Sequence, residues 1–189
     1  MRGQKQEKII RVLLNEKKLL SKNELSKKAE CSRQWVILFL RQLEKKNLVR
    51  ETKVIDPKKL MNYWIGLPKA KTRFKEYMIK DPQKILKNTK LEYTLTTYQA
   101  ENLMQHYLFP SRIDIYVKDE DQQKWHQLLT KNGLYGKGNV RLIVSDMHIS
   151  YNKRRINKLN IVSLPQLILD LYKEGGPCVE AAEMLMKKL

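Results

Sequence analysis

The chain has 189 residues, enough for one large domain or two small ones, and carries 38 Lys and Arg against 20 Asp and Glu. Its first residues, MRGQKQEKII, lack the apolar core of a signal peptide, and no stretch approaches the roughly 20 apolar residues of a membrane span. We therefore expect a cytoplasmic protein with no membrane contact. Cys31 and Cys178 lie far apart in the sequence, which favours free thiols over a zinc site or a disulfide framework.

The positive charge is concentrated in the first half of the chain. Residues 1–90 contain 25 basic and 9 acidic residues, whereas residues 91–189 contain 13 and 11. A lysine-rich composition alone would spread the charge evenly. The uneven distribution favours a polyanion-binding unit followed by an ordinary globular one.

Three helices are predicted before residue 47. Residues 5–15 show the apolar spacing of a short amphipathic helix, with Arg11 among the polar residues. Ser21 precedes Glu24 by three residues, the capping-box pattern that starts a second helix. Ser32 can cap a third helix over 32–46, whose inward side at helical spacing has four apolar residues. These are Val36, Phe39, Leu40 and Leu43.

The segment NLVRETKVIDP then predicts two short strands, 48–50 and 53–55, which are joined at Glu51–Thr52 and end before Pro57. Two helices, a short turn, a third helix and a hairpin follow one another in the order of a winged helix-turn-helix. We therefore expect residues 1–60 to form a DNA-binding domain of this kind.

In a helix-turn-helix, the second helix of the pair enters the major groove with its N-terminal residues near base edges. Arginine recognises guanine, glutamine recognises adenine, and an aliphatic group can contact the thymine methyl. The residues expected to contact bases are Ser32, Arg33, Gln34, Ile37, Leu38 and Arg41. Those expected to contact phosphates are Lys45, Arg50, Lys53, Lys58 and Lys59. The alternative is a protein-docking module in which the third helix is merely solvated. Leu38, on the outer side of that helix, either contacts the groove or belongs to a dimer patch.

Residues 61–90 are expected to form a basic connector, with short helices at 69–80 and 82–90 on either side of Asp81–Pro82. The connector either extends the anion-binding surface or is a solvated linker.

Residues 91–189 alternate strand and helix patterns and predict an α+β domain. Strands are expected at 92–97, 112–117, 140–145 and 158–163. Helices are expected at 98–108, 119–133, with Gly133 at its C-cap, 164–176, where Ser163 is the cap, and 177–189. The methionine-rich last helix is expected to pack mainly in the core, with an interface role as the alternative.

No catalytic or metal-ligating set emerges from the sequence, so we expect neither an enzyme nor a cofactor. His106, His126 and His148 fall in different elements, and Asp114 has no carboxylate two residues further on. GLYGKGNV follows a helix and precedes a strand, whereas a phosphate-binding loop leads from strand to helix. A turn is the better interpretation of this segment.

The whole pattern resembles the AbiEi-type antitoxins of abortive-infection toxin–antitoxin systems and their archaeal relatives. The most specific part is IVSLPQLILDLYKEGGPCVEAAEML at 161–185, with a Leu-Asp-Leu core at 169–171 and a break from Gly175 to Pro177. The resemblance implies a winged helix that binds inverted repeats and represses its own operon. It also implies a C-terminal domain that opposes a nucleotidyltransferase-like toxin.

We therefore predict a sequence-specific regulator of transcription that binds double-stranded DNA as a homodimer and acts as a repressor. The resemblance adds a cognate toxin as a second partner. Two alternatives stay open: an RNA-binding protein that uses the same basic half, and an enzyme of nucleotidyltransferase type.

Overall fold

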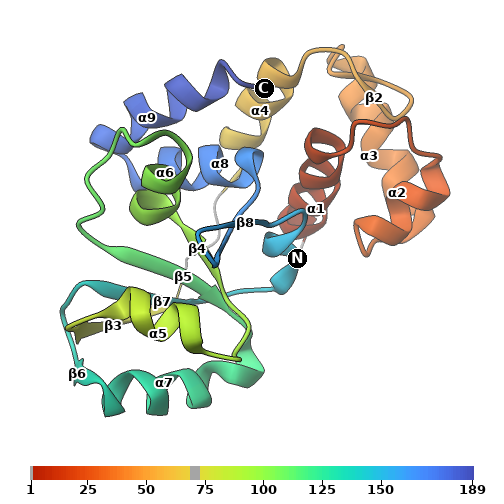
Figure 1. The fold of residues 1–189 in the computed structure, drawn as a ribbon. Helices are drawn as coiled ribbons and strands as arrows, with labels where there is room; N and C mark the ends of the chain where they lie inside the picture. The colour runs from red at the N-terminus through yellow and green to blue at the C-terminus, as the bar shows by residue number, and fades with distance from the viewer. Residues whose placement is uncertain (1, 69–72) are drawn as a thin grey trace.

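The computed structural model describes residues 2–68 and 73–189, which form an α+β protein (Figure 1). A helical unit comes first, and a mixed sheet with helices on its two faces follows. The elements of the helical unit are α1 (Arg2–Asn15), α2 (Lys22–Lys28), α3 (Arg33–Lys45), β1 (Val49–Arg50), β2 (Lys53–Val54) and α4 (Pro57–Ile65).

Side-chain caps define where these helices begin. Ser21 and Glu24 form the predicted capping box at the start of α2, each accepting a hydrogen bond from the other's backbone amide. The Ser32 hydroxyl accepts the Trp35 amide at the start of α3. Asp56 accepts the amides of Lys58 and Lys59 at the start of α4.

The hairpin after α3 is as short as the sequence predicts. Val49 pairs with Val54 and Arg50 with Lys53, and the turn between the strands contains Glu51 at a φ of 55°. The hydroxyl of Thr52 donates to the carbonyl of Leu20, which ties the turn to the segment before α2.

The second part of the molecule is a seven-stranded sheet in the order β6-β3-β7-β5-β4-β9-β8. Only β5–β7 and β4–β9 are parallel pairs among the described strands. The strands are β3 (Phe74–Ile79), β4 (Thr94–Thr96), β5 (Ile113–Val117), β6 (Gly133–Tyr135), β7 (Val140–Val144), β8 (Arg154–Ile156) and β9 (Leu159–Ile161).

Helices cover both faces of this sheet (Figure 1). One face is covered by α5 (Pro82–Asn88) and α7 (Gln122–Lys131). There Tyr93, just before β4, packs in the core with Leu86 of α5 and Trp125 of α7. The other face is covered by α6 (Thr97–Gln105), α8 (Leu164–Glu174) and α9 (Pro177–Met186). Short 3₁₀ turns η1 (Asp119–Asp121) and η2 (Met147–Ser150) follow β5 and β7.

A buried arginine joins the helical unit to the sheet domain. The Arg11 side chain on α1 is only 4% exposed, and its Nε donates to Gln166 Oε1 of α8 at 2.7 Å. Its Nη1 donates to Nδ1 of His148 at 2.7 Å, and Nε2 of that ring lies 3.0 Å from the carbonyl of Lys28. Arg11, one of the charged residues of the amphipathic helix that the sequence predicts, therefore lies on its buried side.

The interval predicted as a connector is not a separate unit. Residues 74–79, expected in a helix, form β3 inside the sheet, where Tyr77 and Ile79 are buried. The first part of that predicted helix, residues 69–72, lies outside the described residues. Residues 82–88 are helical as predicted, whereas α4 was not expected.

Two further strands were missed. Gly133, expected to cap α7, opens β6 instead and pairs with Ile79, and the cap is Asn132. A Cβ at position 133 would come within 2.2 Å of the Met78 carbonyl oxygen, so this close pairing requires glycine. Strand β8 pairs with β9 across a turn in which Asn157 and Lys158 both have positive φ.

Candidate nucleic-acid interface

Helix α3 has the two-sided character expected from its sequence. Val36, Phe39, Leu40 and Leu43 are all at most 1% exposed and pack in the core. On the opposite side, Gln34, Arg41 and Lys45 are exposed. The long apolar run in this segment therefore forms a helix with one buried face, and its polar face is accessible to a partner.

The residues predicted to contact bases fall into three groups. Arg33, Gln34 and Arg41 are exposed along one helix, and Leu38 beside them is 49% exposed. Ile37 is half-buried and contributes only part of its side chain to the surface. The oxygen of Ser32 is engaged in capping, which leaves its hydroxyl hydrogen as the group available to a ligand.

The predicted phosphate contacts surround this surface. Arg50 and Lys53 lie on the hairpin, and Lys58 is in the first turn of α4, all of them exposed. Lys59 is also exposed, and its Nζ lies 3.9 Å from Asp56 Oδ2. Because the Asp56 carboxylate occupies the amides of Lys58 and Lys59, α4 can offer an anion these side chains but not those two backbone donors.

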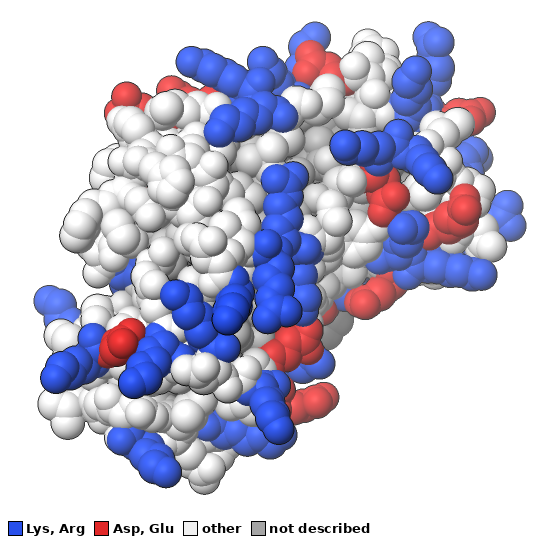
Figure 2. Space-filling view, in the orientation of Figure 1, with Lys and Arg blue, Asp and Glu red and all other residues white. Residues whose placement is uncertain are grey.

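The cations of α3 have no acidic partner in the part of the chain that the structure describes. Among the described residues, Arg33, Arg41 and Lys45 make no ion pair and no side-chain hydrogen bond. In Figure 2, Lys and Arg side chains outnumber acidic ones over the upper right of the molecule, where Figure 1 places α2, α3 and β2. A polyanion would meet free charge at this end of the molecule.

One part of the surface was not anticipated. A hollow of about 380 Å³ lies between the start of α2 and the hairpin turn, and Lys22, Asn23, Arg33 and Thr52 are among its lining residues. Lys22 and Asn23 follow the Ser21 cap directly. The capping-box pattern therefore contained the signal that these two residues occupy an exposed first turn.

No three His, Cys, Asp or Glu side chains within residues 2–68 and 73–189 are grouped so as to hold a metal ion. Burial raises the pKa of Tyr77 to about 12, and its hydroxyl lies 2.9 Å from Nδ1 of His126. His106 caps α6 in a left-handed conformation and is exposed.

Comparison of the chain with known protein families, curated proteins and solved structures finds no match. Every helix in the described part of the chain is too short or too polar to cross a membrane.

Proposed function

We propose that the chain is a sequence-specific regulator that binds double-stranded DNA through a winged helix-turn-helix formed by the helical unit. The observation that supports this most strongly is α3, whose buried apolar side faces the unit's own core while Arg33, Arg41 and Lys45 stay exposed without ion pairs. Two helices joined by a short turn, with a two-stranded hairpin after them, match the order that such domains use to place a helix in the major groove.

In this proposal, Arg33, Gln34 and Arg41 contact base edges, and Leu38 contacts a thymine methyl. The lysines and arginine around them contact phosphates and fix the register without reading sequence. A homodimer on a pseudo-palindromic operator follows from the usual match of protein and operator symmetry. Repression, and a toxin held by the sheet domain, are the roles that the AbiEi-type resemblance adds.

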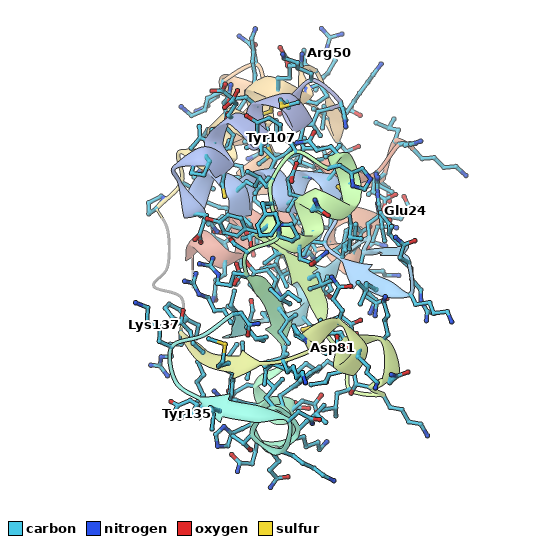
Figure 3. The ribbon with its side chains drawn as sticks, turned by 60° about the vertical axis from the view of Figure 1, so that its left-hand side comes forward. Glu24, Arg50, Asp81, Tyr107, Tyr135 and Lys137 are labelled. Atoms are coloured by element: carbon cyan, nitrogen blue, oxygen red, sulfur yellow. The ribbon has the colours of Figure 1, made fainter. Side chains whose placement is uncertain are left out.

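Fluorescence anisotropy with labelled duplex DNA tests the proposal. The variant Arg41→Gln with Lys45→Gln should bind DNA at least tenfold more weakly, because it removes one base contact and one phosphate contact. The matched control, Lys131→Gln with Lys137→Gln, removes two charges from the end of α7 and from the turn after β6, elements at the opposite end of the molecule from α3 in Figure 1, and should bind as the wild type does. Figure 3 shows Lys137 well away from Arg50 of the hairpin.

Equal losses in the two variants would mean that net charge alone drives binding, and the proposed surface would be wrong. Structured RNA is measured at the same salt concentration. If RNA competes better than duplex DNA, the protein is an RNA-binding protein that uses the same basic half.

A further inference from the structure

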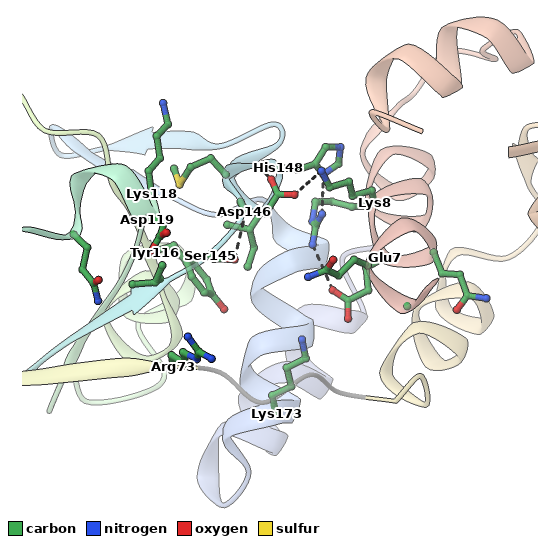
Figure 4. Close-up of a pocket in the computed structure, with 18 of the residues that line it drawn as sticks. Glu7, Lys8, Arg73, Tyr116, Lys118, Asp119, Ser145, Asp146, His148 and Lys173 are labelled. Atoms are coloured by element: carbon green, nitrogen blue, oxygen red, sulfur yellow. Dashed lines mark hydrogen bonds and ion pairs between the residues drawn. The ribbon is translucent and has the colours of Figure 1, made fainter. Parts of the chain in front are cut away.

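A second hollow lies between the helical unit and the sheet domain (Figure 4). Its volume is about 1090 Å³, and one wall is the N-terminal half of α1. The opposite wall is formed where β5 and β7 end, by the segments that lead into η1 and η2. None of the residues assigned to DNA binding lines this cleft.

The topology explains why a cleft forms here. Strands β5 and β7 are parallel neighbours, in register from Ile113 with Val140 to Val117 with Val144. Their carboxyl ends therefore meet at one edge of the sheet, and the chain leaves that edge in separate turns. Crevices at the carboxyl ends of parallel strands are where open α/β sheets bind their ligands.

Two cations of the cleft lack an ion pair among the described residues. Neither Arg73 nor Lys173 makes an ion pair with a described residue, although both line the cleft. The carboxylate one turn before Lys173, Asp170, already accepts hydrogen bonds from Thr96 and Gln166. In Figure 4, Arg73 and Lys173 lie at the lower end of the cleft.

The other lysines of the cleft form ion pairs, unlike Arg73 and Lys173. Lys8 Nζ lies 2.5 Å from Asp146 and 2.6 Å from Glu30, and Lys118 Nζ lies 2.8 Å from Glu92. Hydrogen bonds to Asp146 and Glu30 outweigh partial burial and raise the pKa of Lys8. The positive charge that remains for a ligand is therefore at the end with Arg73 and Lys173.

Arg11 contributes a third group. Its Nε and Nη1 donate to neutral partners, Gln166 and His148, but its Nη2 has no hydrogen bond in the described part of the chain. Glu7, which also lines the cleft, has its Oε2 3.9 Å from Nη2, within ion-pair range but beyond hydrogen-bonding distance. Arg11 is 96% buried and packs over the Trp64 ring, so within the cleft the donor it offers to an anion is Nη2.

Two carboxylates of the cleft indicate that the ligand also has hydroxyl groups. Asp119 and Glu120 follow β5 on the wall that contains Lys118, and neither makes an ion pair with a described residue. Figure 4 shows Asp119 beside Lys118, across the Tyr116 ring from Arg73. Carboxylates accept hydrogen bonds from sugar hydroxyls, as they do from ribose in dinucleotide sites.

We propose that this cleft binds a phosphorylated small molecule that carries a sugar, with its phosphate at Arg73, Lys173 and Arg11 and its hydroxyls at Asp119 and Glu120. The volume suits a nucleotide or a sugar phosphate. Because its walls come from α1 and from the sheet, a bound ligand bridges the two parts of the molecule. The site does not depend on the DNA-binding proposal.

Isothermal titration calorimetry with the full chain at constant ionic strength tests the site, with ATP, glucose 6-phosphate and inorganic phosphate as separate probes. ATP or glucose 6-phosphate should bind saturably. The one that binds shows whether the ligand is a nucleotide or a sugar phosphate. The variant Arg73→Gln with Lys173→Gln should bind it at least tenfold more weakly. The controls Lys131→Gln with Lys137→Gln, and Arg41→Gln with Lys45→Gln, should bind as the wild type does.

The variant Asp119→Asn with Glu120→Gln separates the two ends of the cleft. It should weaken binding of the sugar-bearing probe and leave inorganic phosphate binding unchanged or tighter. Circular dichroism and the Tm without ligand verify that each variant is folded. Wild-type affinity in the Arg73 and Lys173 variant, or no saturable binding of the sugar-bearing probes at millimolar concentration, would overturn the proposal.

A DNA-binding assay on the same variants distinguishes the two proposals. The Arg73 and Lys173 variant should keep ligand-free DNA affinity within about twofold, since both residues lie away from α3. A chain that binds the phosphorylated probe but no DNA would remove the proposed function and keep the cleft.

Discussion

On α3, Arg33, Arg41 and Lys45 are exposed and make no ion pair with a described residue, whereas Arg112 and Arg141 of the sheet domain are surrounded by carboxylates. Arg112 donates to both oxygens of the fully buried Asp114, at 2.6 and 2.8 Å, and to Glu174 at 2.7 Å. Arg141 lies between Glu76 and Glu174.

Basic residues therefore have two roles in this chain: some stabilise the fold through ion pairs, and others stay exposed on its surface. The guanidinium of Arg112 is used inside the fold, and hydrogen bonds to Asp114 and Glu174 outweigh the effect of burial and raise its pKa. The cations of α3 make no ion pair within residues 2–68 and 73–189 and stay available to an external anion. Net charge alone would not separate the two groups.

The largest effect on stability is expected from removing Arg112, which is paired with Asp114 and Glu174. Arg112→Ala should lower the free energy of unfolding by about 3–5 kcal/mol, because it leaves a buried carboxylate with only part of its partners. Urea unfolding measures this loss. Arg112→Lys keeps the charge without the two parallel hydrogen bonds and should fall between the variant and the wild type. A loss below about 1 kcal/mol in Arg112→Ala would show that the network does not stabilise the sheet.

Removing a lysine that has no ion pair among the described residues should weaken DNA binding and leave stability almost unchanged. Lys53→Ala should leave stability within about 0.5 kcal/mol and weaken binding to all DNA sequences alike. The slope of log K against log salt should fall in magnitude by about 1, because one phosphate contact is lost. Lys124, whose Nζ is paired with Asp121 at 2.9 Å, provides the control. A change in slope for Lys124→Ala equal to that for Lys53→Ala would remove the distinction between free and paired lysines.

The start of α2 is expected to depend on its capping box. Ser21→Ala should cost about 1 kcal/mol of stability, because the amide of Glu24 loses its acceptor. Thermal unfolding followed by circular dichroism measures the change. Ser111, an exposed serine with no side-chain hydrogen bond in the described chain, is the matched control. Equal shifts in the two variants would argue against the capping box.

The contact of Arg11 with His148, which joins the helical unit to the sheet domain, should make the stability of the protein depend on pH. Burial, and then the charge of Arg11, lower the pKa of His148. The unfolded chain therefore takes up the proton more readily, so stability is complete above about pH 6.5 and is lost as the pH falls toward the folded value. His148→Gln should flatten the dependence of Tm on pH in this window, and His106→Gln should not. A wild-type Tm that rises on acidification through the window would contradict the assigned hydrogen bonds.

The sequence predicts those features that depend on local pattern. Spacing at 3.6 residues identifies the buried side of α3, and the Ser21 capping box marks the start of α2. β3 was missed because FKEYMI mixes charged and apolar residues without clear alternation. Its strand form comes from pairing with β6 and β7, more than 50 residues further along the chain.

The candidate interface was predictable and the cleft was not. Exposure of Gln34, Arg41 and Lys45 follows from the periodicity of one helix. The cleft depends on Arg11 meeting Gln166 across 155 residues of sequence, and on two parallel strands ending together. Contacts of such separation leave no local trace in a single sequence.

Selection of bound fragments from random duplex DNA, carried out with the wild type and with Arg33→Ala combined with Gln34→Ala, tests the central claim most directly. We predict that the wild type enriches a defined motif. The double variant should still bind DNA but rank sequences less sharply at the contacted positions, by about 1–3 kcal/mol for each lost bidentate pair. An unchanged ranking in the double variant would show that α3 does not read the bases.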